Sequence, residues 1–282
     1  MGLRINTNVP SLIAQRNLRT TRGSLDKSLE RLSSGHRINN AGDDAAGLAI
    51  SESMKAQLRG LGQAERNAQD GISVVQIAEG ALAEVSNILI RLRELGVQAA
   101  SDTVGQSERG FMDVEYQQNL AEIDRIAQST EYNGVPLLNG LTQNFEIQIG
   151  TRNNPMVDRV KLFDGSGADV NIVALGINLA NVADKSSAQS SLAAVDKALS
   201  SITSIRAEFG AMQNRLQSIT SNIMISRENL AAANSRIRDT DMAEETSELT
   251  KNQILMQAGT SVLGQANTTI KTALSLLGGS QG

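Results

Sequence analysis

The stretch ISVVQIAEGALAEVSNILIRLRELGVQA, residues 72–99, is the most strongly patterned part of the chain. Its apolar and small residues recur at steps of three and four: Ile72, Val75, Ala78, Leu82, Val85, Leu89, Leu92, Gly96 and Ala99. This spacing places them along one face of an α-helix, and the burial of such a face requires partner helices. Asp43 or Asp44 can cap this helix, which we expect to begin at Ala45–Ala46.

A second segment, residues 195–237, carries the same spacing and predicts a helix about 65 Å long at 1.5 Å per residue. A shorter helix is expected over 111–128. Between the long helices, FEIQIG (145–150) and VKLF (160–163) alternate apolar and polar residues around a turn-forming loop, which predicts a β-hairpin near 145–163. The expected fold is mainly α, a long antiparallel helical coiled-coil rod with this small hairpin in its central part.

Both ends of the chain also predict helices. In 12–32 we expect one side to hold four leucines: Leu18, Leu25, Leu29 and Leu32. Gly35 is the expected stop, because glycine is favoured just past a helix. The C-terminal helix has its own row of apolar and small residues: Met256, Gly259, Leu263, Ala266, Ile270, Ala273 and Leu277. The small residues allow the backbone of a partner to approach closely.

The two ends carry opposite charge. Residues 1–37 hold seven Lys and Arg against two acidic residues, a net charge of +5, whereas 239–282 hold two Lys against five acidic residues, a net charge of −3. The ends can therefore attract each other. The alternative is that both are simply solvated faces. The whole chain has a formal net charge of −4, which gives no support to a nucleic-acid role.

No catalytic constellation stands out. His36 is the single histidine and is expected in a polar loop, either solvated or hydrogen-bonded across an interface. The acidic run 239–245 lacks the glycine and the final glutamate of a calcium-binding loop. Asp241, with Glu244 three residues later, instead predicts a capping box for the next helix. We expect no enzyme activity, cofactor or metal site.

The composition limits the remaining classes of function. The chain has no cysteine, which excludes disulfides and Cys-ligated metal. No continuous apolar run approaches the length of about 18 residues of a membrane span, so membrane insertion is not expected. The N-terminus lacks the continuous apolar core of a Sec signal peptide. If the protein is exported, we expect another machine to do it.

The same segments carry a family likeness. The chain resembles bacterial flagellin, through RINTN, SLIAQRNL, LSSGHRINNAGDDAAGLAIS, GLGQAERNAQDGISVVQIAEGAL and RLRELGVQAA in its first half. In its second half the likeness lies in VDKALSSI, RAEFGAMQNRL, ANSRIRDTDMAEE, QILMQAG and LGQAN. These blocks span 3–150 and 190–277. Only about 140–187 is left for an insert, so the likeness is to a short flagellin without large outer variable domains.

The resemblance implies a subunit that polymerises into the flagellar filament for motility. It implies export of the unfolded chain by the flagellar type III apparatus to an extracellular filament, with an export chaperone, the filament cap and hook–filament junction proteins as further partners. Residues 1–44 and 243–282 would form the filament core by folding on assembly, and 45–242 the rod-like shell. The residues expected to assemble the core are Leu18, Leu25, Leu29, Leu32, Met256, Leu263, Ala266, Ile270 and Leu277.

The resemblance also points to a contact with a host innate immune receptor at three positions: Arg91, Leu95 and Glu115. An alternative places Arg91 and Glu115 at an interface of the shell. Three rival functions stay open at this point: a hook–filament junction protein, a generic coiled-coil tether that forms dimers, and an enzyme, which the missing nucleophile and histidine sets disfavour.

Overall fold

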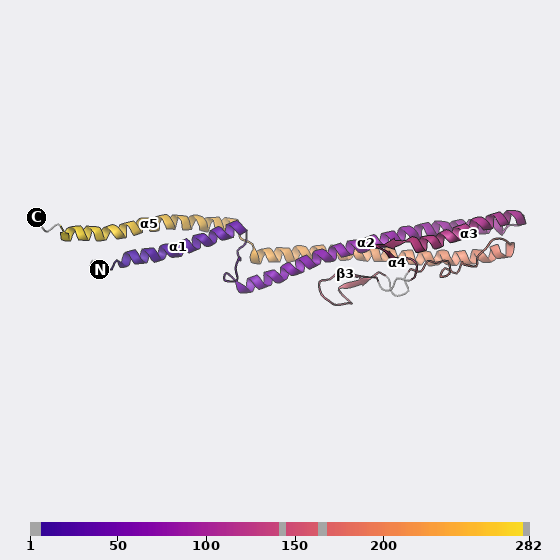
Figure 1. Ribbon diagram of the computed structural model, residues 1–282, viewed down its shortest axis with the longest axis horizontal. Helices are drawn as coiled ribbons and strands as arrows, with labels where there is room; N and C mark the ends of the chain where they lie inside the picture. Colours follow the sequence, from indigo (N-terminus) through magenta and orange to yellow (C-terminus); the bar gives the residue numbers. More distant parts are fainter. Residues whose placement is uncertain (1–6, 141–144, 163–167, 279–282) are drawn as a thin grey trace. The chain divides into compact units, whose positions relative to one another are not determined.

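The computed structural model describes residues 7–140, 145–162 and 168–278, without the side chains of 269–278 (Figure 1). The described residues form helices α1 to α5 and two antiparallel strand pairs, which confirms the mainly α fold with a small hairpin. The elements are α1 (Val9–Ser34), α2 (Ala45–Ala99), α3 (Gln106–Ser129), β1 (Glu131–Tyr132), β2 (Val135–Pro136), β3 (Glu146–Gln148), β4 (Arg159–Lys161), α4 (Lys185–Arg238) and α5 (Met242–Gly278).

Contacts divide the chain into two units. Unit 1 combines residues 1–56 with 230–282, and unit 2 spans 57–229. The domain limits expected from the sequence, 44/45 and 242/243, differ from these unit limits. They lie next to the starts of helices, since α2 begins at Ala45 and α5 at Met242. The assignment of 1–44 and 243–282 to a filament core, and of 45–242 to a shell, stays a prediction.

The core of unit 2 is the apolar face of α2. Its predicted seam from Val75 to Ala99 is almost completely buried, and side chains of α3 and α4 cover it. The covering residues with the least exposure are Tyr116, Ile123, Ala127, Ala188, Val195, Ala198, Ile202 and Leu216. Two contacts for each pair show that both partner helices run antiparallel to α2. Arg109 of α3 lies at Ala99 and Glu115 at Arg91, whereas Lys185 of α4 lies at Asp102 and Asp196 at Arg93. The burial of residues spaced by three and four along both long helices confirms the faces predicted from the sequence.

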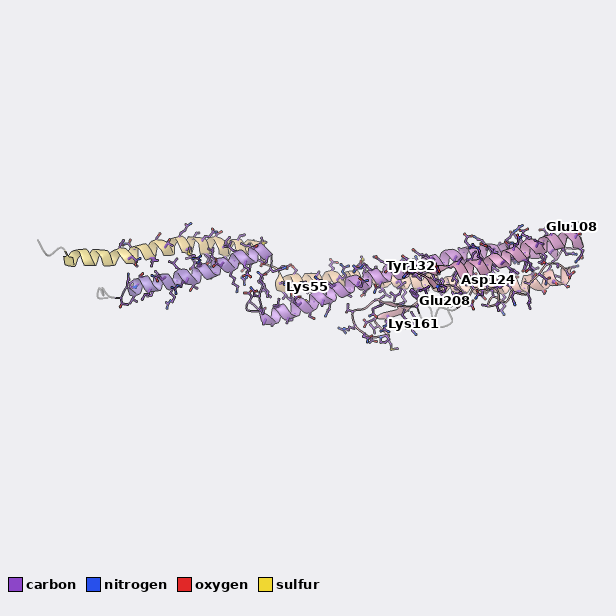
Figure 2. All side chains as sticks on the ribbon, viewed as in Figure 1. Lys55, Glu108, Asp124, Tyr132, Lys161 and Glu208 are labelled. Carbon is purple, nitrogen blue, oxygen red and sulfur yellow. The ribbon has the colours of Figure 1, made fainter. Side chains whose placement is uncertain are left out.

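Arg109 ties the end of α2 to the start of α3. Its side chain is buried, with Nε donating to the carbonyl of Ala99 at 2.8 Å and Nη2 to that of Ser101 at 2.9 Å. The last carbonyls of a helix have no intrahelical partner, so a buried guanidinium satisfies groups that would otherwise lose their hydrogen bonds. In Figure 2 the neighbouring Glu108 marks this end of the unit.

The strand pairs lie against the helices of unit 2. In the predicted hairpin, Ile147 pairs with Val160, and both side chains are buried in the core. Gly71 makes room for this hairpin, because a Cβ at that position would overlap the side chain of Ile147. The pair β1–β2, which was not predicted from the sequence, turns at Asn133 and Gly134, both with positive φ. Phe163, the last residue of the expected hairpin, lies outside the described residues.

Within the described residues, α2 is the helix whose length and composition would allow it to cross a membrane. It contains an 18-residue window with a mean hydropathy of 1.3. In unit 2 the apolar face of α2 is part of the protein core, since its residues from Val74 to Ala99 pack against α3 and α4. A soluble core helix passes the same test of length and composition.

In unit 1, a short antiparallel bridge joins the end of α1 to the start of α5. Gly35 ends α1 with φ +72°, and its carbonyl accepts from the backbone N–H of Thr240 at 3.0 Å. The N–H of Arg37 donates to the carbonyl of Arg238 at 2.6 Å. Between these bonds, Nδ1 of His36 lies 3.2 Å from Oδ1 of Asp239. The single histidine thus holds together two segments from opposite ends of the chain.

The two adjacent aspartates before α2 have different roles. Asp44 is the cap, because its Oδ1 accepts from the N–H of Gly47 at 2.9 Å. Asp43 accepts from the N–H groups of Asn39 and Asn40, and its Oδ1 lies 2.6 Å from the ammonium of Lys27 on α1. The Lys27 ammonium is the main reason that the pKa of Asp43 falls to about 2, and the backbone hydrogen bonds add to it.

We expect Leu89→Ala to destabilise unit 2 by about 2–5 kcal/mol, because it removes a fully buried side chain from the α2 seam. Ile90 is a matched control, since it is the next residue on the same helix and is 46% exposed. Ile90→Ala should cost less than about 1 kcal/mol. Urea unfolding followed by circular dichroism measures both, and equal losses would contradict the seam.

Lys27→Met should raise the pKa of Asp43 from about 2 toward its ordinary value of 3.8. A lowered folded-state pKa adds stability above the unfolded-state value, and this stability is lost as the pH falls through the folded-state value. The variant should therefore be less stable than the parent at pH 7, and the difference should vanish near pH 2. Carbon NMR titration of Asp43 tests the shift, with Lys251→Met, which breaks the exposed pair with Glu248, as control.

Candidate functional site

Helices α1 and α5 form an antiparallel pair built from segments far apart in the sequence (Figure 1). Arg31 near the end of α1 contacts Glu245 near the start of α5. At the other end, Nδ2 of Asn8 donates to the carbonyl of Ala266 at 3.1 Å. The same Asn8 caps α1, because its Oδ1 accepts from the N–H of Ser11. One residue therefore both starts α1 and fixes it to α5.

The seam between these helices is small and polar. Its fully buried members on α1 are Ser11, Ala14 and Ser28, and on α5 they are Glu245 and Asn252. Gly259 lets α1 come close, since a Cβ there would lie 2.7 Å from Cδ2 of Leu18. The close approach expected from the small residues of the C-terminal helix is therefore present at this position.

The residues predicted to assemble the core are not all in this seam. Six of them are half-buried: Leu18, Leu25, Leu32, Met256, Leu263 and Ala266. Leu29 is 49% exposed, because Ser28 occupies the seam position in its place. The side chains of Ile270 and Leu277 lie outside the described residues. The role of all nine in assembly stays a prediction.

The pair leaves most of its large apolar side chains in solvent. In the described part of α1 and α5, Ala14 is the apolar side chain that is fully buried. Large apolar residues of both helices are exposed: Val9, Leu12, Ile13, Leu29, Met242, Ile254, Leu255 and Val262. Soluble monomers rarely leave such a concentration of apolar side chains uncovered, and surfaces of this kind bind partners.

Opposite charge contributes little to the pair itself. In the described part of α1 and α5 one ion pair joins the two helices, between Arg31 and Glu245 at 3.5 Å. At the start of α5, Oδ1 of Asp241 accepts from the N–H groups of Ala243 and Glu244, so Asp241 is the predicted cap. No return bond from the Glu244 side chain to Asp241 is present among the described residues, so this is a simple cap rather than a capping box.

The predicted receptor-contact residues lie in unit 2 and differ in accessibility. Nε of Arg91 donates to Glu115 at 2.9 Å and Nη1 to Glu94 at 3.0 Å, and the pKa of Arg91 is raised mainly by Glu115. The ion pair is exposed and joins α2 to α3. Leu95 is only 2% exposed and lies in the core, where a receptor would not reach its side chain. Receptor contact stays a prediction for Arg91 and Glu115.

The described residues hold no group of three or more histidine, cysteine, aspartate or glutamate side chains arranged to bind a metal. What stands out instead is the surface of the α1–α5 pair. An exposed apolar surface on two weakly packed helices can bind other helices, and it supplies no group for covalent chemistry.

Comparison with known proteins identifies the family that the chain resembles. Residues 5–143 match the family model for the bacterial flagellin N-terminal helical region, and residues 192–277 match that for the C-terminal helical region. The chain is 43% identical to a flagellin of Halalkalibacterium halodurans, over 97% of this chain and 99% of that protein. It is 42% identical to flagellin FlaB2 of Treponema pallidum, with the same coverage, and 41% identical to a Bacillus subtilis flagellin, over 98% and 100%.

Solved structures agree. The crystal structure of Bacillus cereus flagellin aligns with a TM-score of 0.50 and 32% identity, over 60% of this chain and 94% of that one. A putative flagellar hook-associated protein from Vibrio parahaemolyticus aligns with a TM-score of 0.59 at 13% identity, over 70% of this chain and 100% of that one, and this shows a shared fold alone. From the two family models and the identity over nearly its whole length, the chain belongs to the bacterial flagellin family.

Proposed function

We propose that this chain, a structural subunit of the flagellar filament, polymerises through coupled folding and packing of its α1–α5 pair. Flagellins form this filament, a surface appendage, and are structural proteins rather than enzymes. The observation that carries the proposal is the exposed apolar surface of α1 and α5, set against a seam that buries small and polar residues.

The energetic argument compares the two units. A helix is stabilised mainly by packing its apolar face, because ordering each residue costs about 1–2 kcal/mol of backbone entropy. Unit 2 offsets this cost with the continuous core along α2. The α1–α5 pair buries few apolar side chains within one chain, so its helices gain stability when neighbouring copies cover Leu12, Ile13, Leu255 and Val262.

The contacts between copies must also give a polymer that keeps growing rather than a closed ring. Repeated contacts between two different surfaces of identical subunits give a helical polymer whenever the rotation does not close a ring. The α1–α5 pair presents different side chains along its length and around its two helices, which suits contacts of this kind.

Export and the remaining partners are part of the proposal. We infer that the chain passes through the flagellar type III apparatus unfolded and reaches an extracellular filament. A chaperone, the filament cap and hook–filament junction proteins would bind it on the way. The weak packing of α1 against α5 supports this, because a pair with so little buried apolar surface costs little to keep unfolded before assembly.

Deletion of residues 243–282 should abolish polymerisation while unit 2 still folds, because the deletion removes α5 and none of the α2 core. Electron microscopy and sedimentation measure polymerisation, and urea unfolding followed by circular dichroism reports unit 2. Long filaments formed by the shortened protein would contradict the proposal.

Replacing Ile254 and Leu255 together by Asn should raise the critical concentration for polymerisation at least about tenfold. Both side chains are exposed in the single chain, and burial of such residues between copies is worth about 1.5–3 kcal/mol each. Gln253→Asn with Gln257→Asn is the matched control on the same helix. Sedimentation of assembled protein measures the effect, and equal critical concentrations for the two double variants would argue against burial of this face.

A further inference from the structure

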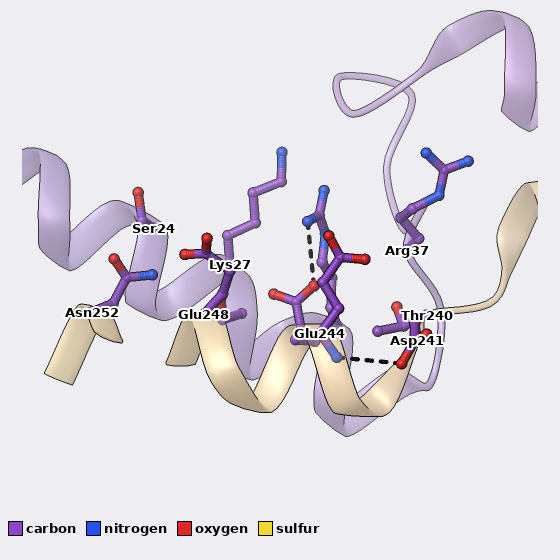
Figure 3. A pocket seen from close by; sticks show the side chains of 11 residues that line it. Ser24, Lys27, Arg37, Thr240, Asp241, Glu244, Glu248 and Asn252 are labelled. Atoms are coloured by element: carbon purple, nitrogen blue, oxygen red, sulfur yellow. Dashed lines mark hydrogen bonds and ion pairs between the residues drawn. The ribbon is translucent and has the colours of Figure 1, made fainter. Parts of the chain in front are cut away.

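A polar groove of about 360 Å³ lies between α1 and α5, close to the start of α5 (Figure 3). Side chains from both helices line it, together with residues of the segment that precedes α5. Its least exposed members are Ser28 from α1, at 4%, and Glu245 and Asn252 from α5, each at 8%. A groove with a polar floor between two helices is unusual, because a seam position normally holds an apolar residue.

Several polar groups of the groove have no partner within the described chain. The side chains of Asn252 and Ser28, both mostly buried, make no hydrogen bond with a described residue, and Oγ1 of Thr240 and Nε of Arg31 are buried atoms without a partner. The exposed carboxylate of Glu244 makes no ion pair among the described residues. Buried polar groups are nearly always hydrogen-bonded, and one left unsatisfied costs about 1–3 kcal/mol. These groups therefore point to a ligand that is absent from the single chain.

The cations of the groove are already engaged. Lys27 lies against Asp43, Arg31 against Glu245, and Nη2 of Arg37 donates to a backbone carbonyl. What is left over, besides the buried Nε of Arg31, is a set of groups that can accept hydrogen bonds: one carboxylate, one amide oxygen and two hydroxyls. A guanidinium group fits such a set, since it has five N–H donors and no acceptor and forms its strongest bonds with carboxylates.

This chain presents guanidinium groups of the required kind. Arg16, Arg19 and Arg22, the arginine row, recur every three residues on α1 and are exposed. Their side chains make neither an ion pair nor a hydrogen bond with any described residue. The row does not reach Glu244 of its own chain. Arg31 marks the level of neighbouring Glu245, and even Arg22, the nearest member of the row, lies nine residues before Arg31, roughly 14 Å along the helix.

We propose that the groove binds arginine side chains of the arginine row from a second copy of this chain. Glu244 supplies the countercharge, and Asn252, Ser28 and Thr240 accept the remaining N–H groups. The proposal rests on polymerisation as the function of the α1–α5 pair, and it names a specific contact within the polymer. The row and the groove are different surfaces. Each copy can therefore insert its row into the groove of one neighbour and accept the row of another, and repeated contacts of this kind form an open polymer.

Charge reversal tests the contact. Arg19→Glu with Arg22→Glu, and separately Glu244→Arg, should each raise the critical concentration for polymerisation at least about tenfold, because each places like charges in the contact. Combining all three substitutions in one chain should bring it back to within about threefold of the parent. An equimolar mixture of the two defective proteins should also polymerise, since each supplies the partner that the other lacks.

The controls separate this contact from folding and from net charge. Asp26→Arg reverses an exposed carboxylate of α1 that does not line the groove, and it should leave the critical concentration within about twofold of the parent. Circular dichroism of each variant checks that its helix content is unchanged. Glu244→Gln is a milder variant, which should raise the critical concentration less than Glu244→Arg, and added salt should have a similar effect on the parent.

The proposal would be overturned by normal polymerisation of both charge-reversed proteins, or by no recovery in either the combined variant or the mixture. An equal loss for Asp26→Arg would also overturn it, because the effect would then come from net charge. None of these results touches the proposed function, which is tested separately by the deletion of residues 243–282 and by the Ile254 and Leu255 double variant.

Discussion

The burial of one face of α2 by α3 and α4 is the interaction on which unit 2 depends. Each step of three or four residues along this face adds a side chain to one continuous core, and the hairpin β3–β4 adds Ile147 and Val160 to the same core. The chain has only six aromatic residues, so leucine, isoleucine, valine and alanine carry this burial. These residues suit long helices, because they pack in regular layers along a seam.

The α1–α5 pair uses the same spacing with different residues, and the physical result is different. Small and polar side chains let the two helices approach closely. At one such position the side chain of Leu18 packs directly against Gly259. They bury little apolar surface, so the large apolar residues remain on the outside. One period of three and four thus produces a self-sufficient core in unit 2 and an incomplete one in unit 1, and the difference lies in which residues occupy the seam.

Much of the fold could be predicted from the sequence, because helix spacing and end signals are local. The stop at Gly35, the cap at one of Asp43 and Asp44, the cap at Asp241 and the seam of α2 all depend on residues within a few positions of one another. The strands β1 and β2 were beyond such reasoning, since two residues are too short to alternate, although Asn133-Gly134 is a strong hairpin signal. Leu29 looks like a seam residue when apolar residues are counted, and only the structure reveals that Ser28 takes its place. The groove was likewise hidden, because its members come from segments more than 200 residues apart.

The backbone bridge between Gly35–Arg37 and Arg238–Thr240 has a consequence for how the ends of the chain order. His36 and Asp239 are separated by 203 positions, yet the bridge holds them together at the point where α1 ends and α5 begins. Closing a loop of that length carries a large entropic cost. The antiparallel packing of α4 on α2 already brings the two segments together, since Arg227 contacts Glu65 and Arg238 contacts Glu52, and the bridge then fixes the ends that lie next to each other. Helices α1 and α5 can then pair one turn after another, starting at the bridge. Each further turn needs only short-range contacts, because the two chain segments are already held next to each other.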